Sequence, residues 1–380
     1  MQHKNQEIES LRAVAVAITC VNHIALLFSW NPNPIGALSP YMQFWGGVDL
    51  FFCISGYVVS KSFLEAFDRA RAVGTHWQSA KAFWVRRAYR LLPSAWFWLI
   101  VSMVCSIFFN DTGAFGTPAG TFRSSAAVLS LTANLSQYFG VPMHPNGVYW
   151  SLALEEQFYM LFPFFLLAVP VPWRWRALVV GVALQFPLAR TTLVDFSWYV
   201  RLDALMLGIL IYLFSRTREY SIFEPRSLGN RGAALITSGA LLSALMIVPA
   251  VLQPLPFHVG LMAIVSALLV FCASFGKGYV LPVGVLRRIL SWIGSRSYAI
   301  YLSHLPAYLL TVEFWTRWAS HKGMAPPNGT YTLRYGITAI VLIVIFSELN
   351  YRLIETPLRR KGAKLAKVIA DRDAGAAMPV

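Results

Sequence analysis

The chain has 380 residues, of which 57% are hydrophobic and only 13% are charged, whereas about 25% of the residues in soluble domains are charged. This composition excludes an ordinary soluble domain. The formal net charge of +15 is also found in nucleic-acid-binding proteins. Here, however, the basic residues occur in short stretches between apolar runs, which indicates membrane topology instead of a nucleic-acid surface. We therefore expect an integral membrane protein that binds the lipid bilayer and no nucleic acid.

The apolar runs have the length that a membrane-spanning helix needs, about 20 residues. They predict an all-α, polytopic bundle of about ten spans, near residues 8–29, 46–64, 93–110, 150–170, 175–190, 200–215, 232–252, 257–275, 297–316 and 334–354. A further segment, 122–138, contains Arg123 and many serine and threonine residues. This polarity favours a re-entrant or protein-buried piece over a lipid-facing span. The first run lacks a small-residue cleavage site, which favours a retained span over a removed signal peptide.

The distribution of Lys and Arg predicts the orientation. If 122–138 does not cross, most basic residues lie on the side of the N-terminus, in 61–92, 171–176, 216–231, 277–296 and 355–380. On the opposite side, 30–45 and 253–256 have none, and 317–333 has only Arg317 and Lys322. The positive-inside rule then places both termini in the cytoplasm. We expect residues 1–360 to form the membrane domain and 361–380 a basic cytoplasmic tail.

Two ionisable residues occur in the first predicted span, where insertion of a charged side chain costs about 2.5 to 3.5 kcal/mol. Arg12 and His23 are eleven residues apart, which places them on one helix face, about 16 Å from each other. They are candidates for chemistry inside the membrane. The alternative is that Arg12 extends to the interface and His23 makes an interhelical hydrogen bond. The four cysteines form no CxxC pair, so neither a disulfide framework nor a metal site is expected.

Arg12 and His23 belong to the first of a series of motifs along the chain. In chain order they are Leu11-Arg12 with His23, the Gly46–Tyr57 segment, Arg86–Pro93, Trp150–Glu155 (WSLxxE) with Phe158-Tyr159, Ser297–His304 (SYxxYLxH) and Glu355–Arg360. The series resembles acyltransferase family 3, the bacterial membrane-bound O-acyltransferases of surface and secreted glycans. The resemblance covers nearly the whole chain. It implies an enzyme of the bacterial inner membrane that moves an acyl group, expected to be acetyl, from acyl-coenzyme A to a glycan or lipid-linked glycan. Many relatives carry a fused periplasmic SGNH hydrolase-like domain, so a relay to such a domain would here require a separate periplasmic partner.

The arginine motif predicts the donor site. Arg86, Arg87 and Arg90 have the spacing of helix neighbours, and guanidinium groups suit the phosphates of coenzyme A. The alternative is a positive-inside cluster that touches lipid phosphate. No metal cofactor is expected.

The histidine is the expected general base. A histidine titrates near neutral pH, so His23 can take a proton from a sugar hydroxyl while that oxygen attacks the thioester. The alternative is a covalent relay through His23 or Ser151, which lies one helical turn from Glu155. Asp49 and Glu155 are the further catalytic candidates, because either carboxylate can orient or stabilise His23. They can instead pair with Arg12 or Arg201 and hold helices together.

The remaining polar and aromatic motif residues are candidates for the acyl or acceptor path. Arg201 and Asp203 are two residues apart, point to different helix faces and are not expected to pair with each other. His304, which precedes Pro306, also fits a structural role. The full set of path residues is Trp150, Ser151, Tyr159, Arg201, Asp203, Tyr298, Tyr301 and His304.

The same buried charges allow two other functions. A transporter or flippase of a lipid-linked or anionic solute would use them as a pathway. A non-catalytic scaffold has no need for them. An arginine cluster together with a histidine inside a span favours thioester chemistry over transport.

Overall fold

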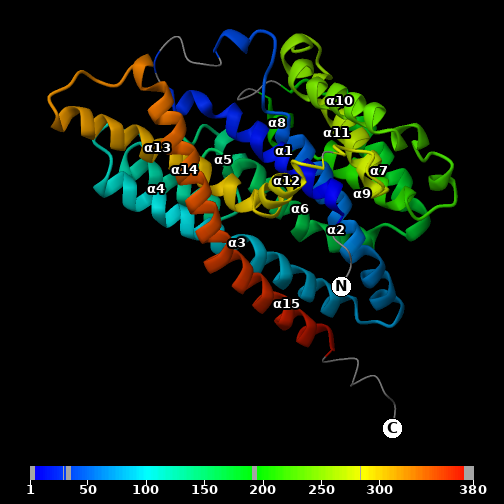
Figure 1. Cartoon of the computed structure of the whole chain (residues 1–380). Coiled ribbons are helices and arrows are strands. Elements are labelled where there is room, and N and C mark those ends of the chain that lie inside the picture. Colours follow the sequence, from blue (N-terminus) through cyan, green and yellow to red (C-terminus); the bar gives the residue numbers. More distant parts are fainter. Residues whose placement is uncertain (1–4, 29, 31–35, 191–194, 283, 372–380) are drawn as a thin grey trace. The chain divides into compact units, whose positions relative to one another are not determined.

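The computed structural model describes residues 5–28, 30, 36–190, 195–282 and 284–371. Within these ranges all regular secondary structure is helical, which confirms the predicted fold class (Figure 1). The α-helices are α1 (Gln6–Asn22), α2 (Gly47–Ala72), α3 (His76–Phe108), α4 (Pro118–Leu129), α5 (Ala133–Tyr138), α6 (Tyr149–Ala168), α7 (Val171–Gln185), α8 (Phe196–Tyr199), α9 (Asp203–Phe214), α10 (Arg231–Val251), α11 (His258–Ser274), α12 (Arg287–Ser295), α13 (Ser297–His321), α14 (Thr332–Asn350) and α15 (Thr356–Asp371). Short 3-10 turns and one π-helical turn, Tyr351–Glu355, join some of them.

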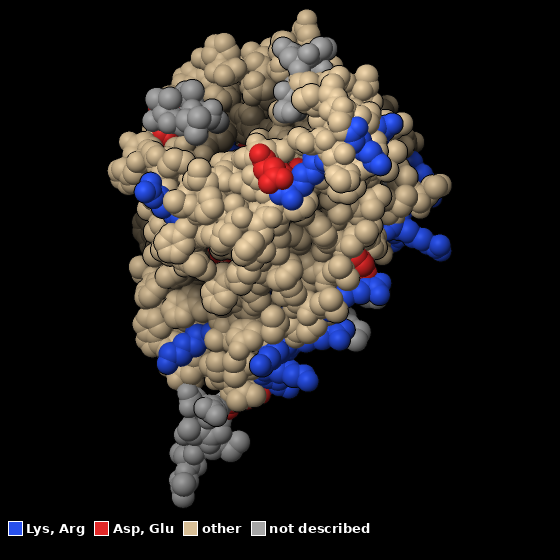
Figure 2. All heavy atoms as spheres, turned by 90° about the vertical axis from the view of Figure 1, so that its left-hand side faces the viewer, with Lys and Arg blue, Asp and Glu red and all other residues tan. Residues whose placement is uncertain are grey.

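Helix lengths agree with a membrane protein. Four described segments are long and apolar enough to cross a bilayer: Gly47–Ala72, His76–Phe108, Arg231–Val251 and Gly329–Asp371. The apolar helices α9 and α11 are shorter and fall on two further predicted spans. On the face drawn in Figure 2, uncharged side chains form most of the surface, as lipid contact requires. The crossing count of ten stays a prediction.

Contacts divide the chain into two compact units. The first contains the chain up to Val59, Pro172–Tyr301 and Asn328–Leu333. The second contains Ser60–Val171, Leu302–Pro327 and the chain from Arg334 onward.

In the first unit, two helices meet at glycines. A Cβ atom on Gly56 of α2 would lie 2.1 Å from the carbonyl oxygen of Leu205, and one on Gly208 of α9 would lie 2.1 Å from the carbonyl oxygen of Cys53. Small residues allow the backbones of membrane helices to approach closely. Gly56 belongs to the second motif, and its role there is this close contact.

Replacing Gly208 with Ala is therefore expected to lower the free energy of unfolding by about 1 to 3 kcal/mol, because backbone must move to admit the methyl group. Gly239 of α10 is the matched control, since a Cβ atom added to it would meet no described atom within 4 Å. Thermal unfolding in detergent should show a lower midpoint for Gly208→Ala and no loss for Gly239→Ala. Equal midpoints would contradict the close packing of α2 and α9.

In the second unit, the basic stretch 61–92 joins the second and third predicted spans. Helix α2 continues to Ala72 and α3 begins at His76, so most of this basic stretch is helical. Hydropathy locates the apolar part of a helix but not its ends, and Lys, Glu, Arg and Ala in this stretch are good helix formers. Arg86, Arg87 and Arg90 consequently lie on α3 itself.

The polar segment 122–138 forms two short helices, α4 and α5, of 12 and 6 residues. Neither reaches the roughly 20 residues that a span needs. Its polar side chains find partners inside the second unit: the amide of Asn146 donates to Ser124 (2.9 Å) and to Ser125 (3.2 Å). These contacts fit the protein-buried interpretation of this segment.

The C-terminal helix α15 lies along α3 in the same unit (Figure 1). A Cβ atom on Gly362 would lie 2.3 Å from the Cβ of Tyr89, the neighbour of Arg90. Residues 361–371 of the predicted basic tail thus continue a packed helix, and the domain boundary predicted at 360 falls inside it. The rest of that tail, 372–380, lies outside the described residues.

Candidate active site

Helix α1 carries the arginine and the histidine of the first motif. Asn5 caps its N-terminus, where the side chain accepts hydrogen bonds from the backbone of Glu7 and Ile8. Arg12 forms an ion pair with Glu9 at 3.3 Å. The helix ends at Asn22, earlier than the predicted span of 8–29, and His23 is its C-terminal cap. A 3-10 turn, Ile24–Leu26, follows.

The position of His23 determines its tautomer. Its Nδ1 lies 2.9 Å from the carbonyl oxygen of Thr19. A carbonyl oxygen only accepts, so Nδ1 is the donor, and in the neutral ring the lone pair lies on Nε2. A general base requires this arrangement of one oriented nitrogen and one accepting nitrogen.

Asp49 and Arg201 form a buried ion pair in the first unit. Their side chains are 3.3 Å apart and wholly buried. Arg201 precedes α9, whereas Asp203 begins it and pairs with Arg190 at 2.6 Å. Arg201 and Asp203 thus each pair with a residue elsewhere in the chain. For Asp49 the contact matches the helix-holding alternative, and a catalytic role stays a prediction.

Aromatic rings surround this ion pair. The guanidinium carbon of Arg201 lies 3.9 Å from the ring centroid of Trp198 and 5.3 Å from that of Trp45. The ring of His258 lies 6.0 Å from that of Trp45. Cation–π contacts of this kind stabilise a buried arginine. Arg190 and the two tryptophans were missed in the sequence, where the only signal was their position at the ends of apolar runs.

The second unit brings the arginine motif and the WSLxxE motif together. The guanidinium carbon of Arg87 lies 4.9 Å from the ring centroid of Tyr159, and the hydroxyl of Tyr159 donates to the carboxylate of Glu155. Trp84 of α3 also donates from its indole nitrogen to the carbonyl oxygen of Tyr159, at 3.1 Å. Arg90 is partly buried, whereas Arg86 is exposed. The three arginines thus follow one helix, with Arg87 held against α6.

The serine of the WSLxxE motif is buried near the start of α6. The hydroxyl of Ser151 donates to the carbonyl oxygen of Val148 at 3.3 Å, a local bond within the first turn. Trp150, beside it, is partly buried. Glu155, one turn further along α6, accepts from Tyr159. A covalent role for Ser151 stays a prediction.

The SYxxYLxH motif lies on α13. Tyr301 packs edge-on against Phe51 with ring centroids 6.2 Å apart, and Tyr298 is partly buried. His304 is wholly buried beside the ring of Tyr308, at 5.9 Å. The burial of His304 against Tyr308 also agrees with a structural role for this histidine.

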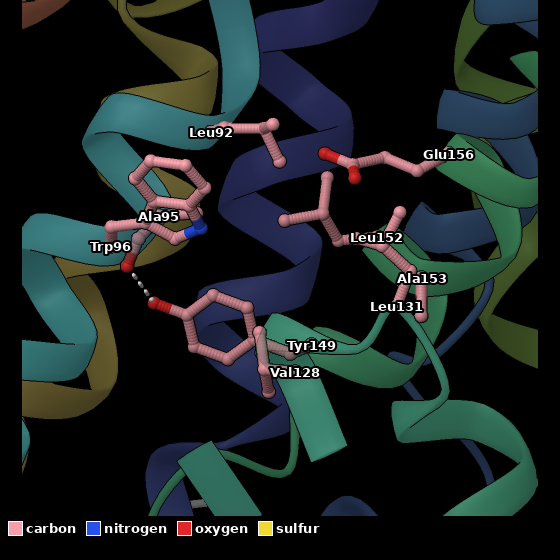
Figure 3. A pocket seen from close by; sticks show the side chains of 9 residues that line it. All are labelled: Leu92, Ala95, Trp96, Val128, Leu131, Tyr149, Leu152, Ala153 and Glu156. Atoms are coloured by element: carbon pink, nitrogen blue, oxygen red, sulfur yellow. Dashed lines mark hydrogen bonds between the residues drawn. The ribbon is translucent and has the colours of Figure 1, made fainter. Parts of the chain in front are cut away.

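Glu156, the acid that directly follows the WSLxxE motif, was missed in the sequence. Its side chain points into an apolar pocket of the second unit (Figure 3). Glu156 is 7% exposed, and its Oε1 has no hydrogen-bond partner among the described residues. The signal was present, because any acid inside an apolar run is costly to insert. In the part of the chain that the structure describes, no group of three or more His, Cys, Asp or Glu residues is placed to hold a metal ion.

Fold and site define an all-helical membrane protein with ionisable side chains inside its apolar segments. Residues 5–348 match the family described as an acyltransferase domain, and the chain belongs to this family, acyltransferase family 3. It is similar to the peptidoglycan O-acetyltransferase OatA of Listeria monocytogenes, with 28% identity over 379 residues that cover 93% of this chain and 56% of that protein. It is also similar to the O-acetyltransferase OatA of Staphylococcus aureus, with 26% identity over 342 residues that cover 84% of this chain and 53% of that protein.

The chain spans about half the length of these curated relatives. No solved structure matches it.

Proposed function

We propose that the protein is a membrane O-acetyltransferase that moves an acetyl group from acetyl-coenzyme A to a hydroxyl group of a glycan or lipid-linked glycan. The observation that carries this proposal is the hydrogen bond from His23 to Thr19 in a member of an acyltransferase family, because it leaves Nε2 as the proton acceptor. The named relatives support a glycan acceptor of the peptidoglycan class.

The proposed reaction is a direct transfer. Nε2 of His23 takes the proton of the acceptor hydroxyl as the oxygen attacks the thioester carbonyl carbon. The carbon–sulfur bond then breaks, and the thiolate of coenzyme A leaves and takes up the proton. Arg12, whose side chain pairs with Glu9, is proposed to act through the helix face that it shares with His23, at the opposite end of α1 from the reacting oxygen.

The acids and the arginines receive separate roles. Arg86, Arg87 and Arg90 are proposed to bind the phosphates of the donor. Glu155 then positions Arg87 through Tyr159. Asp49 is proposed to keep Arg201 in place, so that the two tryptophan rings and this cation form a fixed wall for the acceptor.

The remaining motif residues complete the proposed substrate path. They are Trp150, Ser151, Asp203, Tyr298, Tyr301 and His304. The protein is proposed to lie in the inner membrane of a bacterium with ten crossings and both termini in the cytoplasm, and a separate periplasmic protein is a proposed partner.

The direct test uses purified protein in detergent or lipid vesicles with radiolabelled acetyl-coenzyme A and a peptidoglycan fragment as acceptor. We expect label in the glycan and release of free coenzyme A. A transporter or flippase would release no coenzyme A. Absence of both products from well-folded protein would contradict the proposal.

The orientation gives a further prediction. In a background without the four native cysteines, Ser221→Cys, in the exposed segment before α10, should be shielded from an impermeant thiol reagent added outside the cell. Lys322→Cys, in the exposed segment after α13, should be labelled. The positive-inside rule is the physical reason. Mass-tag gel shifts measure the labelling, and the reverse pattern would contradict the ten-span arrangement.

A further inference from the structure

Helix α12 is a short helix of the first unit that lies beside α1 (Figure 1). It has nine residues, Arg287–Ser295, which extend about 14 Å, whereas a span needs about 20 residues. A Cβ atom on Gly294 would lie 2.0 Å from the carbonyl oxygen of Glu9, so the two backbones are in direct contact. Because α1 begins at Gln6, α12 lies at the end of α1 that the positive-inside rule places on the cytoplasmic side.

The apolar side chains of α12 face away from α1. Ile289, Trp292 and Ile293 have the i, i+3, i+4 spacing of one helix face. Gly294, which contacts α1, lies about 140° around the helix from Ile289. The side chain of Ile289 is 56% exposed, and that of Val285, just before the helix, is 94% exposed. This face therefore gains stability from an apolar partner outside the described chain.

Basic side chains border the same face. Arg287 and Arg288 are exposed, and neither forms an ion pair within the part of the chain that the structure describes. The guanidinium carbon of Arg296 lies 4.9 Å from the ring centroid of Trp292. Tryptophan rings are enriched at the level of the lipid headgroups, and arginines border the apolar face of helices that lie in the plane of the membrane interface.

The partner of α12 must offer apolar surface to Ile289 and negative charge to the two arginines over the length of one short helix. The cytoplasmic leaflet of the bilayer offers both, because its phosphate-bearing headgroups lie directly above its acyl chains. Helix α12 is already at the predicted cytoplasmic end of α1, where this leaflet ends. A protein partner or a second copy of the chain would have to displace lipid from the same place.

We propose that α12 is an interfacial helix of the cytoplasmic leaflet. Val285 and Ile289 insert among the acyl chains, and Arg287 and Arg288 bind the headgroups of anionic phospholipids. Because α12 and α1 are in direct backbone contact at Gly294, the position of α12 in the lipid also fixes the depth at which α1 begins.

The test places an environment-sensitive fluorophore on α12. In a background without the four native cysteines, Ile289→Cys and Ser291→Cys are labelled in lipid nanodiscs of phosphatidylcholine and phosphatidylglycerol, which leave both membrane faces accessible. The two positions lie about 160° apart around the helix, and Ser291 is exposed. A quencher carried on the acyl chains should reduce emission from position 289, and iodide in the water should not. Emission from position 291 should be reduced by iodide, as should that from Ser227→Cys in the exposed segment before α10.

Lipid charge tests the two arginines. An arginine near an anionic surface strengthens binding, and each of the two is expected to change the ratio of inserted to water-exposed probe at Ile289→Cys by about fivefold. Combining Arg287→Gln with Arg288→Gln should therefore lower this ratio, and so should nanodiscs of phosphatidylcholine alone. Arg226→Gln removes an arginine that is 82% exposed in the same unit and should leave the ratio unchanged.

Two results would overturn the inference. One is quenching of position 289 by iodide to the extent seen at Ser227→Cys, which would place α12 in water. The other is shielding of position 289 from both quenchers, which would indicate a protein cover such as a second copy of the chain. If Ile289→Cys does not fold, Val285→Cys takes its place, because its side chain is the more exposed. An inserted probe whose ratio is the same with and without phosphatidylglycerol would overturn the role of the arginines. None of these measurements uses acetyl transfer, so each outcome leaves the proposed function standing.

Discussion

Replacing His23 with Ala is expected to reduce acetyl transfer by on the order of a hundredfold or more, the usual contribution of a positioned general base. The variant should still fold and bind coenzyme A, because the expected role of His23 is at the acceptor oxygen and not at the phosphates. Release of coenzyme A and label in the glycan, followed under saturating donor, measure the loss. The pH profile should also lose its acidic limb, since the group that must be neutral to accept the proton is gone.

A histidine outside the proposed machinery provides the control. Nε2 of His144 lies 2.7 Å from the carbonyl oxygen of Ala114, a contact with backbone like that of His23 with Thr19. His144→Ala should therefore reproduce any effect of losing a histidine–backbone hydrogen bond, while it keeps acetyl transfer. A His23→Ala protein that transfers acetyl near the normal rate would remove His23 from the mechanism and favour the covalent Ser151 or transporter interpretations.

The apolar runs predicted where the helices lie better than where they end. The runs near 46–64 and 93–110 fall on α2 and α3, but α2 continues to Ala72 and α3 begins at His76. Burial in lipid selects apolar side chains only over the thickness of the hydrocarbon layer, whereas helical hydrogen bonding continues wherever propensity allows. The arginine motif lies on α3, where the helical spacing of Arg86, Arg87 and Arg90 placed it, although it precedes the apolar part of that helix.

Contacts between residues that are distant in sequence explain the other differences between the predictions and the structure. The pairing of Asp49 with Arg201 was one of two open alternatives, because the spacing of residues on one helix says nothing about the charge on a neighbouring helix. Glu155 and Glu156 are adjacent, and about 100° separates them around α6. Only the packed structure shows that Glu155 accepts from Tyr159 whereas Glu156 lies in the pocket. The Arg87–Tyr159 contact joins two motifs whose proximity no local pattern predicted.

Replacing Arg87 or Arg90 with Ala is expected to raise the apparent KM for acetyl-coenzyme A by on the order of tenfold or more for each residue. The reason is that each charge-assisted hydrogen bond to phosphate contributes about 1.5 to 3 kcal/mol. The KM for the glycan acceptor and kcat should change little, because the phosphates are remote from the reacting carbonyl and bind equally in the ground state and the transition state. Initial rates with each substrate varied in turn give both constants.

Arg87 needs a variant of its own, because its guanidinium group also packs against Phe83 and Tyr159, at 5.6 and 4.9 Å from the ring centroids. Arg87→Lys keeps the charge but loses the planar fork, so it should recover part of the donor affinity if phosphate binding is the role. Lys81→Ala removes an exposed positive charge from the same helix and should leave the donor KM unchanged. An increase confined to the acceptor KM would assign these arginines to the acceptor, and equal loss in Arg87→Ala and Lys81→Ala would reduce their effect to the general positive charge of α3.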